Sequence, residues 1–180
     1  AIITATSHAY IRSAALAVTG AVSVTTTARS YANADILEAQ FSVSVISVSL
    51  LATYARSEGN FQAYIDTTGK SMATGALTVH TTYYAIANAA TGAGGGLGVS
   101  LADISANAAY ASNNATASSS LRGSGSLTVA GGANITTEGY ARSAAIGKTR
   151  SFSVSALKVA VNVVYATLNI NQSAYINITG

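Results

Sequence analysis

Apolar and small polar residues alternate along three stretches of the chain, at 41–65, 97–121 and 152–176. The first stretch begins with the letters FSVSV, in which every second residue is apolar. Strict alternation with a period of two is typical of a β-strand, because successive side chains of a strand point to opposite faces. The three stretches align with one another without a gap, so we expect three equivalent long strands.

The phase of this alternation changes at the same place in all three stretches. In the first stretch the apolar positions are 41, 43 and 45, and then 46, 48, 50, 52 and 54. A strand cannot move its apolar side chains to the other face without a bulge or a corner. We therefore predict a bend between the fifth and sixth positions, at Val45–Ile46, Leu101–Ala102 and Ala156–Leu157.

The three stretches are the most similar part of a longer internal repeat. They begin 56 and 55 residues apart, and the segments between them are related but contain gaps. The chain is predicted to be a single repeat array, with a partial repeat at 1–11, repeats at 12–65, 66–121 and 122–176, and the start of another at 177–180. Because it begins and ends within a repeat, we expect either a window on a longer array or ends that neighbouring subunits complete.

A fixed period of this kind predicts a stacked architecture in which each repeat contacts its neighbours. The predicted fold class is all-β, a parallel β-solenoid (β-helix) of repeats of about 55 residues stacked in register. A repeat of this length fits either one wide coil with long strands or two coils of unequal shape, and the sequence leaves both open. Equivalent residues should lie about 4.8 Å apart from coil to coil.

Stacking in register predicts ladders of equivalent side chains. The ladder positions are Tyr54, Tyr110 and Tyr165; Val43, Val99 and Val154; Phe41, Leu97 and Phe152; and Ile65, Leu121 and Ile176. We expect the tyrosines to face inward or to line a groove, and the aliphatic ladders to pack in the core. On that assignment Val154→Asp disrupts assembly, whereas Ser153→Asp on the other face is tolerated.

Charged residues also fall into columns. The position after each strand reads Arg12, Asp66, Arg122 and Asn177, and Asp103 shares another column with Lys158. Opposite charges on neighbouring coils attract, although an exposed pair contributes only about 0–1 kcal/mol.

The composition indicates a chain held together by hydrogen bonds and packing. Its 180 residues include no Cys and no Pro, so no disulfide framework exists and every residue is able to donate a backbone N–H to a strand ladder. The net charge is +3, but the nine basic residues form no run, so we expect no nucleic-acid partner. The longest uncharged hydrophobic stretch, near 39–55, alternates with serine, so we expect a strand there and no membrane span.

Residues that carry catalysis or bind metals are few and scattered. The two histidines, His8 and His80, fall in different parts of the repeat, and no cysteine supports a metal site. Carbohydrate-cleaving solenoids need two or three clustered acids, whereas the six carboxylates here share no column. The glycine-rich segment 92–98 leads into a strand and has no following lysine, unlike a phosphate loop. We predict no catalytic, cofactor-binding or metal-binding residues, no cofactor and no enzymatic activity.

Four asparagines lie in glycosylation sequons: Asn114, Asn134, Asn171 and Asn177. Repeats rich in Asn and Thr produce such sequons by chance. The four positions are candidate sites for modification if the chain is made in a cell that glycosylates asparagine.

The order of short motifs resembles a known class of repeats. Ala-Tyr-Ile, a turn with glycine, a Thr/Val strand, a Gly-rich turn and a Val-Ser-Val strand follow one another, most clearly within 63–101. This pattern resembles the repeat regions of large bacterial secreted adhesins of the filamentous-haemagglutinin-like and autotransporter-like kinds, which have β-solenoid stalks. The resemblance implies a structural protein, an extracellular or cell-surface fibre or stalk. It implies as partners copies of the chain end to end or further repeats of the same chain, together with cell-surface molecules or glycans.

Two alternatives remain open from the sequence. One is a pilin-like β-sandwich subunit that polymerises by inserting its N-terminal strand, residues 1–11, into a neighbour. The other is a carbohydrate-binding or carbohydrate-cleaving solenoid that uses the tyrosine ladder as a platform for sugars.

Overall fold

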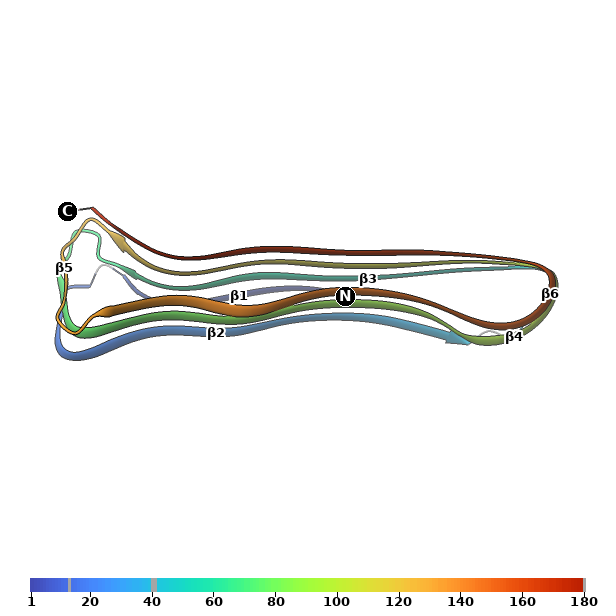
Figure 1. Cartoon of the computed structure of the whole chain (residues 1–180), viewed down its shortest axis with the longest axis horizontal. Helices are drawn as coiled ribbons and strands as arrows, with labels where there is room; N and C mark the ends of the chain where they lie inside the picture. The colour runs from blue at the N-terminus through green and yellow to red at the C-terminus, as the bar shows by residue number, and fades with distance from the viewer. Residues whose placement is uncertain (13, 40–41, 180) are drawn as a thin grey trace.

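The computed structural model of the chain describes residues 1–12, 14–39 and 42–179, and only the backbone of 37–39, 42, 93–97 and 149–153. The strands are β1 (Ile2–Arg12), β2 (Leu16–Ala39), β3 (Ser42–Asp66), β4 (Met72–Gly123), β5 (Leu127–Val129) and β6 (Ala133–Ile178). They form a long, flat molecule of two layers (Figure 1). Phe41, one of the predicted ladder positions, lies outside the described residues, as does Gly180.

The strands pair in parallel, and each pairing joins residues 54 to 56 positions apart. Val99 of β4, for example, lies between Val43 of β3 and Val154 of β6. Since equivalent positions of consecutive repeats are direct neighbours, one repeat forms one coil. The predicted parallel β-solenoid is confirmed, and the choice between one coil and two is settled in favour of one.

Each coil runs out along one sheet and returns along the other. Residues 72–94 of β4 pair with β2, and residues 98–122 of the same strand pair with β3. The strand is therefore continuous through the bend, and β6 behaves in the same way. We call the layer with β1 and β3 the β3 sheet and the layer with β2 the β2 sheet. Figure 1 shows the bend of β4 and β6 at one end of the molecule, the bend end, and the turns around β5 at the other, the turn end.

The change of phase predicted between the fifth and sixth positions is an irregularity in the ladder. The register passes from Ser44 opposite Ser100 directly to Ile46 opposite Ala102, with no pair at Val45. The two consecutive side chains of Val45 and Ile46 are both exposed on the outer surface. The offset between paired residues is 56 on both sides of the gap, so neither strand has the extra residue of a β-bulge. The predicted change of face at this point is confirmed, whereas the turn from one sheet to the other lies earlier in the coil, between residues 94 and 98 of β4.

The aliphatic side chains around this irregularity point to solvent. Val43 and Val154 are 74% and 76% exposed, whereas Ser105, on the inner side of the sheet, is 7% exposed. The assignment of the Val43, Val99 and Val154 ladder to the core is therefore wrong, and Val154→Asp is compatible with the fold.

Larger side chains near the turn end decide which side of the strand is inside. Phe61 and Ile65 of β3 are buried, and both are odd-numbered. Because a strand has a period of two, the even-numbered apolar residues from Ile46 to Tyr54 must point the other way. The burial of the two larger side chains near the turn end thus exposes the aliphatic row near the bend end.

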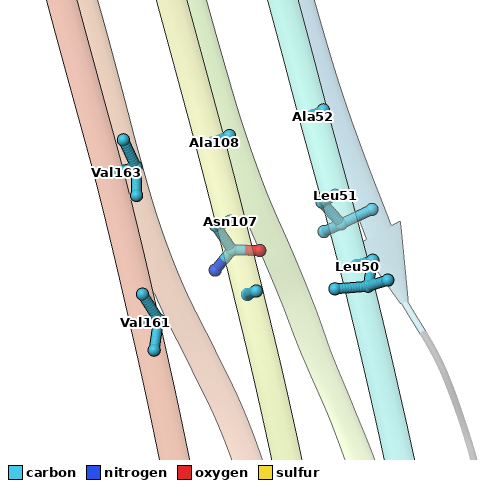
Figure 2. Close-up of a pocket in the computed structure, with 8 residues that line it drawn as sticks. Leu50, Leu51, Ala52, Asn107, Ala108, Val161 and Val163 are labelled. Atoms are coloured by element: carbon cyan, nitrogen blue, oxygen red, sulfur yellow. The ribbon is translucent and has the colours of Figure 1, made fainter.

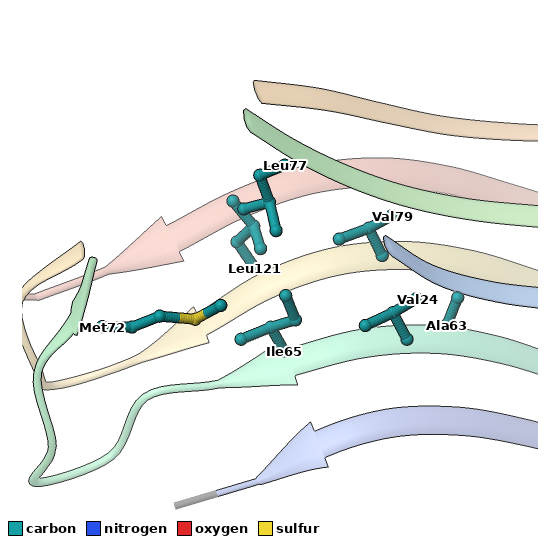
Figure 3. Packing of buried hydrophobic residues seen from close by; sticks show 7 residues of the cluster. All are labelled: Val24, Ala63, Ile65, Met72, Leu77, Val79 and Leu121. Atoms are coloured by element: carbon teal, nitrogen blue, oxygen red, sulfur yellow. The ribbon is translucent and has the colours of Figure 1, made fainter. Parts of the chain in front are cut away.

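The core changes in character along the molecule. At the turn end it is an aliphatic cluster from both sheets, formed by Val24, Ala63, Ile65, Met72, Leu77, Val79 and Leu121 (Figure 3). In the middle it consists of alanines, namely Ala32, Ala55, Ala87, Ala89, Ala109 and Ala111. Alanine lets the two sheets approach closely and leaves little space for a larger side chain.

Two buried aromatic residues are accommodated by small neighbours in the next coil. Phe61 packs on Tyr83 across the interior, with ring centroids 5.8 Å apart. In β4 the ladder neighbour of Phe61 is Ala117, and in β6 that of Tyr83 is Gly139. A Cβ atom at Gly139 would collide with the Tyr83 ring. Each large ring therefore depends on a small residue beside it.

Gly75, near the turn end, lies against the backbone of the preceding coil. A Cβ atom there would clash with the carbonyl of Thr19 and lie 3.0 Å from the carbonyl oxygen of Gly20. We expect Gly75→Ala to lower the free energy of unfolding by about 1–3 kcal/mol, since backbone atoms must move. Gly20→Ala is the matched control, because no atom lies within 4 Å of its added Cβ. Urea unfolding followed by circular dichroism measures both, and equal losses would contradict the close approach of the coils.

Candidate functional site

The described ladder positions lie side by side in consecutive coils. The rings of Tyr54, Tyr110 and Tyr165 stack with centroids 4.9 and 5.2 Å apart and lie on the outer surface of the β3 sheet, not inside. The other columns pair Val43 with Val99 and Val154, Ile65 with Leu121 and Ile176, and Leu97 with Phe152. These columns hold the coils in register.

A column of charged and polar side chains follows the turn end of the β3 sheet. The Oδ2 atom of Asp66 lies 3.8 Å from Nε of Arg12 and 3.9 Å from Nε of Arg122. The pKa of Asp66 is lowered because the hydroxyl and amide of Thr68 donate hydrogen bonds to its Oδ1, with a further contribution from the two arginines. Asn177 continues the column opposite Arg122. Both arginine side chains are exposed while Asp66 is partly buried, and each pair contributes about 0–1 kcal/mol, so the pairs favour the correct register more than they stabilise the fold.

A second polar column lies inside the β3 sheet near the bend end. Asp103 lies opposite Lys158 in the ladder and accepts a hydrogen bond of 2.9 Å from the hydroxyl of Ser47. Asn107 donates to the side-chain oxygen of Asn162 at 3.1 Å, from one coil to the next. Polar side chains therefore form hydrogen bonds between neighbouring coils, in addition to those of the backbone.

Threonines bridge the two sheets in three consecutive coils. Thr26, Thr81 and Thr137 occupy one column of the β2 sheet, where each lies beside the next. Their hydroxyls donate to the backbone carbonyls of Gln62, Ser118 and Ser173 in the β3 sheet, at 3.0, 2.9 and 2.8 Å. This column was not predicted from the sequence, because the three threonines lie in the gapped segments, although their spacing of 55 and 56 residues marks them as equivalent positions.

Thr26→Val keeps the shape of the buried side chain but removes its hydrogen bond to Gln62. We expect the free energy of unfolding to fall by about 1 kcal/mol, the usual net value of one such bond. The adjacent Thr27 is exposed, so Thr27→Val should change it by no more than about 0.5 kcal/mol. Chemical unfolding of the two variants distinguishes them, and a larger loss for Thr27→Val would show that the sheet faces are reversed.

The edges of the solenoid present long rows of backbone groups. Within the described ranges, β1 pairs only with β3, whereas β2 and β6 each pair only with β4. Unpaired N–H and C=O groups along such edges are able to bond to another strand. Both edges can therefore receive a further coil in the same parallel register.

The outer surface of the β3 sheet carries an apolar patch near the bend end. We call it the aliphatic face, and it consists of the outward side chains of 43–54 in β3, 99–110 in β4 and 154–165 in β6. These outward positions include no charged residue. A hollow of about 260 Å³ lies where β4 has Ala106, between Leu50 and Val161 of the neighbouring coils (Figure 2).

Behind the aliphatic face the interior is polar. The hydroxyls of Ser44, Ser100 and Ser105 are buried and have no hydrogen-bond partner among the described residues. Buried hydroxyls of this kind are destabilising. This half of the coil therefore has a polar interior that contributes little stability and an apolar exterior. An ordinary two-layer sheet has the opposite arrangement.

The few chemically reactive side chains are not brought together. His8 lies in the β3 sheet opposite Gln62, whereas His80 lies in the β2 sheet. The hydroxyls of Thr136 and Thr82 lie 2.6 and 2.7 Å from the two ring nitrogens of His80. Over residues 1–12, 14–39 and 42–179, no three His, Cys, Asp or Glu side chains are grouped so as to hold a metal ion.

The four sequon asparagines, Asn114, Asn134, Asn171 and Asn177, are all exposed, and their glycosylation stays a prediction. In the portion of the chain described here, no helix has the length and apolar character needed to cross a membrane. What the geometry offers is assembly surfaces: two sheet edges and one aliphatic face. Comparisons with protein-family models, curated proteins and solved structures found no match to this chain.

Proposed function

We propose that this chain is a structural segment of an extracellular fibre or adhesin stalk, a β-solenoid whose coils continue end to end. The observation that supports this most is the parallel register, in which Tyr54, Tyr110 and Tyr165 and the residues around them repeat from coil to coil. Each coil has the shape and hydrogen-bonding pattern needed to template the next. The extracellular location rests on the resemblance of the sequence to repeats of secreted adhesins.

The proposed function is mechanical. Backbone hydrogen bonds between coils run along the axis of the stack, so stretching the stalk would have to break many of them together. Each coil adds about 4.8 Å of length, so a stalk of 100 Å needs about 20 coils, on the order of 1,100 residues. Such a demand suits either a very large chain or many subunits joined at their edges.

The two alternatives have less support. Donor-strand insertion requires residues 1–11 to be free, whereas β1 pairs with β3 along its whole length. A sugar platform requires exposed ring faces, but the rings of Tyr54, Tyr110 and Tyr165 are stacked nearly parallel, with interplanar angles of 2° and 14°. Both faces of the Tyr110 ring are therefore covered, and only its edge is presented to solvent.

Two measurements test the proposal. Cryo-electron microscopy of the purified chain should show thin filaments with an axial layer line near 4.8 Å, whereas dispersed particles without that spacing would contradict templating by the edges. Antibodies raised against the chain should label the surface of intact cells of the source organism. Labelling that requires permeabilised cells would contradict the extracellular assignment.

A further inference from the structure

We propose that the aliphatic face is the surface through which two copies of this chain pair side by side, each covering the face of the other. This pairing is separate from end-to-end stacking. It uses the outer side chains of the β3 sheet, whereas stacking uses the sheet edges.

The aliphatic face has a sharp boundary. Beyond the tyrosine ladder, the same outer surface of β3 carries Arg56, Glu58 and Asn60. On the other side of the molecule, the outer surface of β2 carries exposed polar residues such as Thr25 and Arg29. Exposed rings on that surface, such as Tyr31 and Tyr140, alternate with charged or polar side chains, whereas the aliphatic face is contiguous. Contiguous apolar patches of several hundred Å² usually mark an interaction site.

The size of the face points to a second copy as the partner. Twelve residues of strand span about 40 Å and three strands span about 14 Å, which gives about 570 Å² per copy. Two such faces bury about 1,100 Å² in total, just above the ~1,000 Å² that a specific interface requires. Each further coil of a longer array adds about 190 Å² per copy, and only a partner built from the same repeat grows at the same rate.

The relief and charge of the face also suit self-pairing. Leu50 and Val161 form ridges on either side of Ala106, and the hollow between them has a volume of about 260 Å³. In a twofold arrangement, Leu50 of one copy enters the hollow of the other while the paired sheets lie about 10 Å apart, as in a β-sandwich. No charged side chain occupies the outward positions, so the face has nothing to repel an identical surface.

Two double variants test this pairing. Leu50→Lys with Ile104→Lys places two charges on the aliphatic face, at diagonal positions of neighbouring coils. Asn60→Lys with Asn114→Lys is the matched control, because it uses the same strands, outer surface and diagonal spacing ten residues further along. Sedimentation equilibrium, and filament width in cryo-electron micrographs where filaments form, report pairing. Circular dichroism reports the fold.

We expect the wild type and the control to pair, and the aliphatic-face variant to pair at least tenfold more weakly with an unchanged circular dichroism spectrum. Paired chains without filaments would support side-by-side pairing and contradict end-to-end stacking. Filaments of single width would support end-to-end stacking and contradict side-by-side pairing. Equal pairing by the two variants would overturn the inference. It would also be overturned if the Leu50→Lys, Ile104→Lys chain unfolds while the control stays folded, because the aliphatic side chains would then belong to the core. Wild-type chains that stay single but bind phosphatidylcholine vesicles would assign the face to a membrane instead.

Discussion

Replacing Ser105 by aspartate is expected to unfold the bend end of the solenoid, whereas the same change at the adjacent Ile104 should leave the fold intact. Ser105 is 7% exposed and faces the interior, and its hydroxyl has no partner among the described residues. A carboxylate there would be buried on the same side of β4 as Asp103. An uncompensated buried charge costs about 3–5 kcal/mol.

Ile104 is 41% exposed on the outer surface of the same strand. A carboxylate at that position stays in water, and the poor strand propensity of aspartate costs about 1 kcal/mol at most. Urea unfolding of Ser105→Asp and Ile104→Asp compares the two faces directly. A greater loss for Ile104→Asp would place the aliphatic row in the core and refute the orientation of the β3 sheet.

Phe61→Ala is expected to lower the free energy of unfolding by about 3–5 kcal/mol. The Phe61 side chain is fully buried and stacks on Tyr83, with ring centroids 5.8 Å apart. Its ladder neighbours, Ser7 and Ala117, are too small to fill the cavity that the change creates. The lost transfer free energy is therefore not recovered by repacking.

Tyr31→Ala serves as the control for this experiment, because Tyr31 lies exposed on the outer surface of β2. Its removal deletes a ring of similar size but opens no cavity, so we expect a loss of about 1 kcal/mol or less. Thermal and urea unfolding of both variants provide the comparison. Similar losses at the two positions would show that Phe61 does not pack between the sheets.

The parallel register and the change of face were accessible from the sequence because the three strands align without gaps. The offset between Val43, Val99 and Val154 directly gives the residues that pair, and the change of phase at Val45–Ile46 marks the irregularity. Both inferences depend only on order and spacing along the chain. The period of two in a strand then determines which residues share a face.

The direction of the aliphatic face was not accessible in the same way. Alternation shows that Ile46 and Tyr54 share a side of the strand, but it does not show whether that side is inside. The buried positions of Phe61 and Ile65, further along the same strand, decide the matter. The apolar positions are even-numbered from Ile46 to Tyr54 and odd-numbered from Phe61 onward. The longest apolar row therefore lies outside, and the shorter row with the larger buried side chains forms the core.

The coil architecture and the bridges between the sheets also lay beyond the sequence. A repeat of 55 residues has the length for one wide coil or for two, and only the pairing of β3 with β4 selects one. The bridging hydroxyl of Thr81 donates to Ser118, in the part of the coil that returns along the other sheet. Nothing in the spacing of the two residues reveals that the sheets face each other at that point.

A distance between two spin labels shows whether one repeat forms one coil. The chain has no cysteine of its own, so nitroxide labels at Asn60→Cys and Asn171→Cys report a single distance when the protein is diluted with unlabelled chains. Asn60 lies opposite Thr116, and Thr116 lies opposite Asn171, so the labelled positions are two coils apart. We expect strong dipolar broadening from backbone positions about 10 Å apart, whereas a separation of about 20 Å or more would mean two coils per repeat and would contradict this fold.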